Sequence, residues 1–430
     1  MRILSNGFLT NVPDSPKAPQ GGTENFARLF INYILSSGAE HRWTGVMLSG
    51  VDSKKIKLRK IFSSTYREYH RLYMPRTLIN LVTQTRHPVD PEEVWGKPIQ
   101  RLVVLMREQK PDVLFLNGMG FLNWMLLKAA EQTGTPVVMQ HAGIWHKELE
   151  FAKYPYTRIG RRLLEQMERD ITNVAAVEIF LNEWSKDYYH NHVTPTKRRT
   201  SEVVPLPFDF SVFWALSKGA GAFPFSKKYR HIGMIGRWDK IKNHEAVLGL
   251  AKAAKNKKLP WQFHVVTELP PPAERPFAMR EYEQYVDIVA PMDKGDIARF
   301  CKGLDLLIVP SHFDVSPTVV LESTALNTPV AISPNVGYIS EFLTHGAGQW
   351  VIDFSNPTRA LAQMAKIVGK KIPRPLKAYL RKAHDHRRVF DTYLELFKHA
   401  QLRKVPMSKV FKVLLQQEVG KYIPERKPKK

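Results

Sequence analysis

The residues with the clearest chemical potential are two carboxylates, Asp314 and Glu322, which stand eight positions apart in the stretch SHFDVSPTVVLES. The stretch LDLLIVP at 304–310, apolar except for Asp305, predicts a buried strand just before them, and SPTVVLESTAL predicts a helix. Asp314 would then lie in the loop at the carboxyl end of the strand, where ligands bind in open parallel sheets. A carboxylate there can accept hydrogen bonds from hydroxyl groups such as those of a sugar. The alternative is a pair of solvated acidic residues near a helix start.

The start of the same helix is a candidate anion site. Ser316 is a suitable N-cap, and Pro317 suits the first helical position because its missing N–H would have no partner there. The N–H groups that a helix leaves unpaired at its start attract anions, so the turn from Ser316 to Thr318 would face a phosphate.

The stretch GRWDKIKN places two cations beside another helix start. The predicted strand HIGMIG ends at Gly236, and Arg237 and Lys242 flank the loop that leads into the next helix. A guanidinium, an ammonium and a helix start are three converging positive elements, which suit a diphosphate better than a single carboxylate. Either cation alone would be ordinary surface charge, but the pair in this position favours ligand binding.

Two further positions could contact a ligand. Gly21 and Gly22 precede Thr23, a candidate N-cap, so backbone N–H groups could approach a bound group closely there. A simple turn is the alternative. His141 ends the predicted strand VVMQH and would lie at the ligand edge of the sheet, although a lone histidine at a strand end is more often structural.

The elements that must position these residues alternate along the chain. Apolar strands separated by single helices predict βαβ units and parallel sheets. The first series ends near residue 206, a linker rich in proline and glycine follows at 207–230, and the pattern then restarts. We therefore predict an α/β fold with two Rossmann-like, doubly wound domains, 1–206 and 207–385, that face each other across a cleft. A terminal helix and a basic tail occupy 386–430.

The chain is strongly basic. It has 64 Lys and Arg against 40 Asp and Glu, a net charge of +24. Residues 54–76 hold eight Lys or Arg and one Glu, interleaved with apolar residues roughly as in an amphipathic helix, which could pack on the sheet or lie on a membrane. Polyanions that fit are a phosphate-bearing substrate, an anionic membrane surface or nucleic acid, and a solvated basic face is equally compatible.

Cysteine usage and hydropathy indicate the compartment. The single cysteine, Cys301, excludes an internal disulfide and is typical of a reducing environment. No signal-peptide pattern and no run of 18 apolar residues occurs. We expect a cytoplasmic protein that could be peripheral at the inner membrane face.

Four motifs in order, GGTE, PVVMQHAG, GRWDKIKN and DVSPTVVLESTALNTPVAI, give the chain a family resemblance. From Met1 to about residue 400 it resembles a family 4 glycosyltransferase of the GT-B class, including the five-residue spacing of Arg237 to Lys242 and the eight-residue spacing of Asp314 to Glu322. The resemblance implies a retaining enzyme. Its second domain would bind a nucleotide-diphosphate sugar, its first domain an acceptor, and its terminal helix would cross back to the first domain.

The resemblance also implies roles for the candidate residues. Those that touch the diphosphate or the transferred sugar, and form the catalytic set, would be Asp314, His141, Arg237 and Lys242. Glu322 would bind the ribose hydroxyls of the donor. The full donor-binding set would be Gly21, Gly22, Arg237, Lys242, Ser316, Pro317, Thr318 and Glu322. Two departures from the family pattern stand out: Asp314 replaces the usual Glu, and Asn243 stands where Gly is common.

The expected chemistry needs neither a metal nor a cofactor beyond the nucleotide sugar. No Asp has another Asp two positions away, so the Asp-x-Asp clamp of metal-dependent glycosyltransferases is missing. Breaking a sugar–phosphate bond builds negative charge on the diphosphate, which Arg237, Lys242 and the helix starts would stabilise. Because no residue stands out as a nucleophile, we hypothesise front-face transfer in which the leaving phosphate assists deprotonation of the acceptor.

The acceptor and the alternatives follow from the charge. A glycan or lipid-linked acceptor, anionic and held near a membrane surface, would suit the basic segments. The two other hypotheses are a non-catalytic GT-B subunit that scaffolds a partner, which Asp314 favours, and a nucleic-acid-binding protein, which the charge favours. No recognisable nucleic-acid module occurs, so nucleic acid is not the expected partner.

Overall fold

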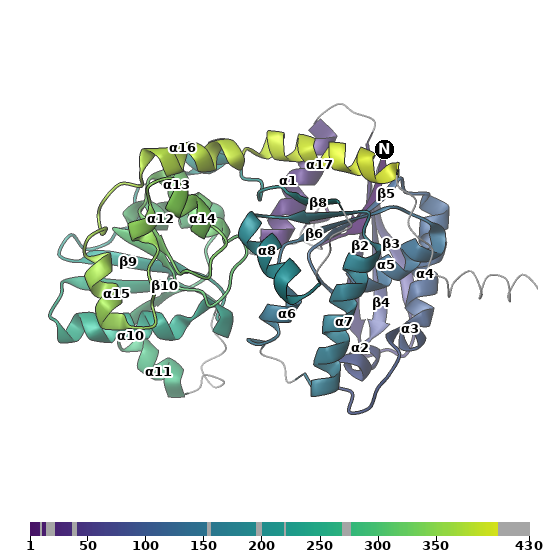
Figure 1. The fold of residues 1–430 in the computed structure, drawn as a ribbon, viewed down its shortest axis with the longest axis horizontal. Helices are drawn as coiled ribbons and strands as arrows, with labels where there is room; N and C mark the ends of the chain where they lie inside the picture. The colour runs from purple at the N-terminus through teal and green to yellow at the C-terminus, as the bar shows by residue number, and fades with distance from the viewer. Residues whose placement is uncertain are drawn as a thin grey trace, which may run out of the picture.

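The computed structural model describes residues 1–8, 11–13, 22–36, 41–152, 156–194, 200–218, 221–268 and 277–402. They form two units side by side, each a sheet between layers of helices (Figure 1). This confirms the predicted α/β fold with two parallel-sheet domains.

The first domain is built on an eight-stranded sheet in the order β3-β4-β2-β1-β5-β6-β7-β8, in which only β3 is antiparallel to its neighbour. Its strands are β1 (Arg2–Asn6), β2 (Arg42–Val51), β3 (Lys57–Ser63), β4 (Arg67–Pro75), β5 (Val113–Asn117), β6 (Val137–His141), β7 (Val177–Phe180) and β8 (Thr200–Val203). Its helices are α1 (Gly22–Ser36), α2 (Arg76–Thr83), α3 (Pro91–Val94), α4 (Gly96–Gln109), α5 (Phe121–Thr133), α6 (Trp145–Glu148), α7 (Arg158–Val174) and α8 (Glu183–His192).

The second domain has a five-stranded, fully parallel sheet in the order β11-β10-β9-β12-β13. Its strands are β9 (Arg230–Ile235), β10 (Trp261–Val266), β11 (Val286–Val289), β12 (Leu306–Val309) and β13 (Val330–Ile332). Its helical elements are α9 (Phe210–Lys218), η2 (Lys240–Lys242), α10 (His244–Asn256), α11 (Phe277–Glu283), α12 (Lys294–Gly303), α13 (Thr318–Leu326), α14 (Ile339–Thr344), η4 (Gly348–Trp350), α15 (Pro357–Met364) and α16 (Arg374–Ala383).

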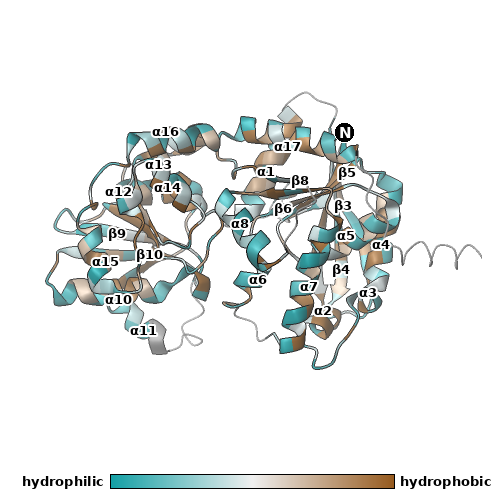
Figure 2. Cartoon of the chain, in the orientation of Figure 1, coloured by the Kyte–Doolittle hydropathy of each residue, from teal (hydrophilic) through white to brown (hydrophobic). Residues whose placement is uncertain are grey.

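Burial of apolar side chains explains both sheets. Strands β5 and β6 are buried at every position, as expected for parallel strands with helices on both faces. Helices such as α7 are apolar on one side only, so they cover the sheet and turn their charged side to water (Figure 2). The loops that follow the carboxyl ends of β9 and β12 in the second sheet carry Arg237, Lys242 and Asp314.

A terminal helix, α17 (His386–Gln401), joins the two domains. Helix α16 lies over the second domain, and α17 continues along the first domain beside α1 (Figure 1). Phe390 and Tyr393 of α17 are fully buried, and their rings contact those of Phe26 and Phe30 from α1. Tyr393 also donates a hydrogen bond to Gln140 of β6. The last helix therefore completes the core of the first domain.

The basic segment 54–76 is not a helix, contrary to the sequence-based expectation. It forms the hairpin of β3 and β4 at the edge of the first sheet, with a register shift between Lys60 and Phe62. Two-residue alternation is the pattern that matters here: Leu72 and Met74 are fully buried while the intervening Tyr73 is only partly so. The edge strand β3 is mostly exposed, which suits its lysines and arginines.

The apolar stretch QWVID at 349–353, whose residue types favour a strand, does not form one. Its residues form the short turn η4 and then a single bridge from Val351 to Ile332. The basic tail beyond residue 402 lies outside the described residues.

Candidate functional site

Five candidate residues of the second domain, Arg237, Lys242, Asp314, Pro317 and Thr318, meet the first domain at one cavity of about 210 Å³, called here the interdomain cavity. The first domain contributes Gly22, the first residue of α1. The second domain contributes the ends of β9 and β12 and the residues that follow them: Met234, Ile235, Gly236, Arg237, Lys242, Ile308, Val309, Pro310, Ser311, Asp314, Pro317, Thr318 and Val319. The cavity therefore lies at the carboxyl edge of the second sheet, as predicted for a ligand site.

An ion pair between Lys242 and Asp314 lies at the centre of the site. The Lys242 Nζ is 2.5 Å from the Asp314 Oδ2, and only 22% and 13% of the two side chains are exposed. Both line the interdomain cavity. The sequence predicted a diphosphate as the ligand of Lys242 and sugar hydroxyls as the ligands of Asp314. It did not predict that the two side chains contact each other.

The turn that carries Lys242 is fixed by its neighbours. Asp239 caps η2 by accepting the N–H of Ile241 at 3.1 Å. Asn243 has φ +57°, in the left-handed region that glycine and asparagine tolerate best, and its side chain caps α10 at Ala246. Asparagine can therefore adopt the backbone conformation needed at position 243, where glycine is common in the family that the chain resembles.

The loop that carries Asp314 is held through its backbone. The Asp314 N–H donates to the Asn335 carbonyl at 3.1 Å, and the Asp314 carbonyl accepts from Gly337 at 2.9 Å. A Cβ at Gly337 would lie 2.0 Å from the Val315 carbonyl, so only glycine fits there. Asn182 of the first domain donates to the same Val315 carbonyl at 2.7 Å. The Asp314 loop is thus fastened to both domains.

Arg237 is the most accessible cation of the site. It lines the interdomain cavity, 81% of its side chain is exposed, and its nearest carboxylate is Asp239 at 3.7 Å. Such an exposed pair contributes little to stability. The guanidinium can therefore turn towards an anionic ligand at small cost.

Two helix starts converge on the same cavity. An ideal Cβ at Gly22 would lie 3.8 Å from the Thr318 Cγ2, so the beginnings of α1 and α13 are in contact. Pro317 and Thr318 also line the cavity. Gly21, predicted to act with Gly22, lies outside the described residues. The N–H groups at the two helix starts add positive potential beside Lys242.

The predicted role of Ser316 as N-cap is wrong. Helix α13 begins at Thr318, Pro317 stands at the N-cap position, and no side chain caps the helix. The Ser316 hydroxyl instead forms a hydrogen bond with the Tyr338 hydroxyl at 2.9 Å. The side chain of Ser316 is therefore already engaged, and it is not among the residues that line the cavity.

Glu322 lies one turn into α13 and is 9% exposed. Burial raises the pKa of its carboxyl to about 7, while the charge of Lys294 opposes this. Lys294 in turn donates to Asn25 of the first domain at 2.8 Å. Glu322 does not line the interdomain cavity, so its role at a ribose remains a prediction.

His141 lies inside the first domain. Its side chain has no exposed surface, its Nε2 is 3.0 Å from the Glu178 Oε1, and its ring stacks on Phe180 at 4.4 Å. The structure does not bring His141 to the cavity with the other candidates. A sugar contact by His141 stays a prediction, and it would require exposure that this arrangement does not give.

Sequence reasoning missed Glu148, the last residue of α6. Burial and the charge of Asp314 raise the pKa of its carboxyl to about 7, and Lys242 and Arg237 act in the opposite direction. The pKa of Glu148 therefore depends on all three charged residues of the second domain that line the cavity, Asp314, Lys242 and Arg237. No motif marks Glu148, since it ends a four-residue helix that is too short to show periodicity.

Glu168 of α7 holds the helix that carries Glu148. It is fully buried and accepts the backbone N–H groups of Trp145 at 2.9 Å and His146 at 2.7 Å. Burial raises the pKa of Glu168 to about 8, although the two N–H donors lower it. Glu168 thereby fixes the start of α6.

Neither a metal-binding cluster nor a membrane-spanning helix occurs in the part of the chain that the structure describes. Among these residues, no group of three or more His, Cys, Asp or Glu side chains is placed to bind a metal ion. No described helix is both long and apolar enough to cross a membrane.

The comparisons with known proteins agree on the second domain and on the fold. Residues 221–385 match the family model described as "Glycosyl transferases group 1". A D-inositol 3-phosphate glycosyltransferase from Thermobispora bispora is 31% identical over 83 residues, which cover 19% of this chain and 19% of that protein.

Solved structures extend the similarity to nearly the whole chain. A sucrose-phosphate synthase from Thermosynechococcus elongatus superimposes with a TM-score of 0.69 at 14% identity, covering 93% of this chain and 98% of the other. A structure titled "Trehalose-6-phosphate from E. coli bound with UDP-2-fluoro glucose" gives a TM-score of 0.64 at 12% identity, covering 93% and 99%. An α,α-trehalose-phosphate synthase from Burkholderia xenovorans in complex with glucose-6-phosphate gives 0.63 at 9% identity, covering 92% and 99%. These findings identify residues 221–385 as a glycosyl transferases group 1 domain, set in a chain with the two-domain GT-B fold of glycosyltransferases.

Proposed function

We propose that the chain is a retaining, metal-independent glycosyltransferase of family 4, which moves a sugar from a nucleotide-diphosphate sugar to a hydroxyl acceptor. The observation that carries this proposal is the Lys242–Asp314 pair in the interdomain cavity, beside Arg237 and the starts of α1 and α13. A diphosphate binds where fixed positive groups converge, and a carboxylate suits the hydroxyls or the developing positive charge of the sugar.

The reaction follows from this arrangement of charge. As the bond between the anomeric carbon and the β-phosphate breaks, its electrons pass to the diphosphate, and Lys242, Arg237 and the helix N–H groups stabilise that charge. The acceptor hydroxyl gives up its proton to a base as its oxygen forms a bond to the anomeric carbon from the face that the diphosphate leaves, which retains configuration. Lys242 exchanges Asp314 for the diphosphate when the donor binds, and this releases Asp314 to the sugar.

Two of the solved structures of similar fold suggest which donor and which acceptor to test first. A UDP-sugar is the first donor to test, because the E. coli structure of similar fold is titled as bound with UDP-2-fluoro glucose. A phosphorylated hydroxyl compound is the first acceptor to test, because the Burkholderia xenovorans structure is in complex with glucose-6-phosphate. The net charge of +24 favours such an anionic acceptor.

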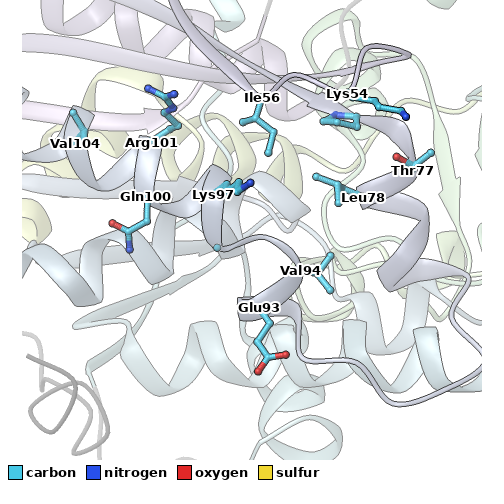
Figure 3. A pocket seen from close by; sticks show the side chains of 12 residues that line it. Lys54, Ile56, Thr77, Leu78, Glu93, Val94, Lys97, Gln100, Arg101 and Val104 are labelled. Atoms are coloured by element: carbon cyan, nitrogen blue, oxygen red, sulfur yellow. The ribbon is translucent and has the colours of Figure 1, made fainter. Parts of the chain in front are cut away.

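A cavity of about 930 Å³ on the first domain could hold part of a larger anionic acceptor, such as a glycan or lipid-linked phosphate (Figure 3). It lies beside Pro75, where β4 ends at the carboxyl edge of the first sheet. Lys54, Lys97 and Arg101 line it, and none of them has an ion pair with another described residue. Its remaining lining residues are Ile56, Pro75, Thr77, Leu78, Glu93, Val94, Gly96, Gln100 and Val104. Unpaired cations beside apolar side chains suit an anionic amphiphile, and with it the surface of an anionic membrane.

A ligand screen tests the transferase proposal. UDP, GDP, ADP and their glucose conjugates are added to the full chain, and unfolding temperature and donor consumption are recorded with and without glucose 6-phosphate. A nucleotide at 100 times its dissociation constant stabilises the fold by about 2.7 kcal/mol, which is readily measured. Proton NMR of the product gives the anomeric configuration. If none of the nucleotides stabilises the chain and none of the donors is consumed, the proposal fails.

Vesicle flotation tests the proposed acceptor surface separately. Binding to vesicles that contain phosphatidylglycerol, with none to pure phosphatidylcholine, is the expected result. Lys97→Glu combined with Arg101→Glu should abolish it, whereas a matched charge reversal at Lys366 and Lys370 of the second domain should not. Equal loss in the two double variants would show that total charge, and not this cavity, governs binding.

A further inference from the structure

The carboxylate of Glu148 belongs to the first domain and does not line the interdomain cavity, but it interacts electrostatically with Asp314, Lys242 and Arg237 of the second domain. It folds back over the loop between β6 and α6, because an ideal Cβ at Gly143 would be 2.3 Å from the Glu148 Oε1. A side chain at Gly143 would occupy this space. The carboxylate therefore lies at the carboxyl end of β6, the ligand edge of the first sheet.

A ring contact between the domains holds the segment just after Glu148 against the second domain. Phe151, three residues beyond α6, stacks on His312 with ring centroids 5.3 Å apart and planes 8° from parallel. His312 stands two residues before Asp314, and its N–H donates to the carbonyl of Ile241, the neighbour of Lys242, at 2.8 Å. The same contact thus ties α6 to both members of the central ion pair.

Glu148 has no ion pair with any described residue, unlike Asp314, which has Lys242. Its carboxylate interacts with the backbone of Ile144 in its own loop. A partly buried carboxylate without a cation partner at a ligand site can bind a hydroxyl and accept its proton. Asp314 is less suited to that task, because the donor engages it: when the diphosphate displaces Asp314 from Lys242, Asp314 binds the transferred sugar.

We propose that Glu148 binds the acceptor hydroxyl and takes up its proton as the acceptor oxygen bonds to the anomeric carbon. The O–H bond breaks towards the Glu148 carboxylate, the new C–O bond forms, and the electrons of the old C–O bond leave with the diphosphate. Glu148 later releases the proton to water. The inference rests on the proposed transferase function, and it assigns to Glu148 the proton that front-face transfer would otherwise give to the leaving phosphate.

The charged groups around Glu148 determine the pH range in which it can act as a base. Asp314 and Glu168 are the acidic groups that interact with it, and Lys242 and Arg237 are the basic ones. With burial, they place the pKa of Glu148 at about 7. A base acts only when deprotonated, so turnover should rise with pH through this value.

The kinetic test compares Glu148→Gln with Glu150→Gln in the full chain. Glu150 is an exposed residue of the same segment and pairs with Lys147 at 2.6 Å, so its variant controls for the lost charge. The substrates are glucose 6-phosphate and whichever of UDP-, GDP- and ADP-glucose the wild type consumes fastest. Glu148→Gln should lower kcat about 100-fold and remove the rise near pH 7, while Glu150→Gln should retain both. A kcat within threefold of the wild type, with the same pH profile, would overturn the proposal.

Calorimetry gives a readout that does not depend on turnover. UDP is titrated at pH 7 in two buffers of different ionisation enthalpy, which reports the protons taken up on binding. The diphosphate charge should raise the pKa of Glu148, so the wild type should take up protons and Glu148→Gln should take up fewer at a similar Kd. Equal proton uptake in the two proteins would refute the placement of Glu148 beside the bound diphosphate. If UDP, GDP and ADP all fail to bind, the transferase proposal itself fails.

Discussion

Replacing Lys242 by Ala tests the charge arrangement most directly. The ammonium is the least exposed cation of the interdomain cavity, with 22% of its side chain accessible against 81% for Arg237. Removing a preorganised charge from a developing anion typically lowers kcat about 100-fold, which is about 2.7 kcal/mol of transition-state stabilisation. We therefore expect kcat/KM for donor consumption to fall by that factor or more, together with the affinity for UDP.

The same substitution should also affect stability, because it leaves Asp314 unpaired. An exposed ion pair contributes up to about 1 kcal/mol, and breaking a buried one costs about 3–5 kcal/mol. The Asp314 side chain is 13% exposed, so we expect an intermediate loss of about 1–2 kcal/mol. This corresponds to a fall of a few degrees in Tm for domains of this size.

Lys240→Ala is the matched control for Lys242→Ala. Lys240 belongs to the same turn, η2, but it is exposed and does not line the cavity. The assay is donor consumption at saturating and limiting donor, with UDP-induced stabilisation measured in parallel. If both alanine variants behave alike in the two measurements, the reasoning that places a diphosphate at Lys242 is refuted.

Three further predictions concern metal, pH and packing. Donor consumption should be unchanged in EDTA, since the described cations take the role of a metal; strict dependence on added Mg²⁺ or Mn²⁺ would contradict this. Glu168 has a pKa of about 8 in the folded chain, above its ordinary value of 4.5, so its contribution to the free energy of unfolding should fall as pH rises between these values. Glu168→Gln should flatten this fall in urea titrations from pH 5 to 9, and an unchanged slope would count against it. Phe390→Ala should lower stability by about 3–5 kcal/mol because the side chain is fully buried; Lys398→Ala, on the exposed side of the same helix, should have little effect in the same titration.

Strands marked by a continuous apolar run, and helices that end at a glycine, could be predicted from the sequence almost to the residue. The strands VLFLN and VVMQH are buried at every position, and α5 ends at Gly134, whose φ of +69° suits glycine. The hairpin at 54–76 could not be predicted in the same way, because its apolar residues fit a helical and a two-residue period equally well. Only the pairing of β4 with β2, in which Trp43 stands opposite Arg67, decides between them.

The candidate site was predictable to the extent that its residues follow strand ends. Lys242 and Asp314 are 72 residues apart in sequence, yet both follow strands of one parallel sheet, so their common edge follows from the topology. Glu148 could not be found this way, because its importance arises only when the second domain approaches α6. His141 is itself the last residue of a strand, but the contact of its side chain with Glu178 inside the sheet is not visible in the local sequence.

The position of α17 has a consequence for synthesis on the ribosome. Phe390 and Tyr393 fill space beside Phe26 and Phe30, so nearly four hundred residues must leave the exit tunnel before the first core can close. A nascent chain or a proteolytic fragment that stops after α16 keeps an uncovered aromatic surface, a target for chaperones and for aggregation. Only a chain that has been translated through α17 can therefore bury that surface.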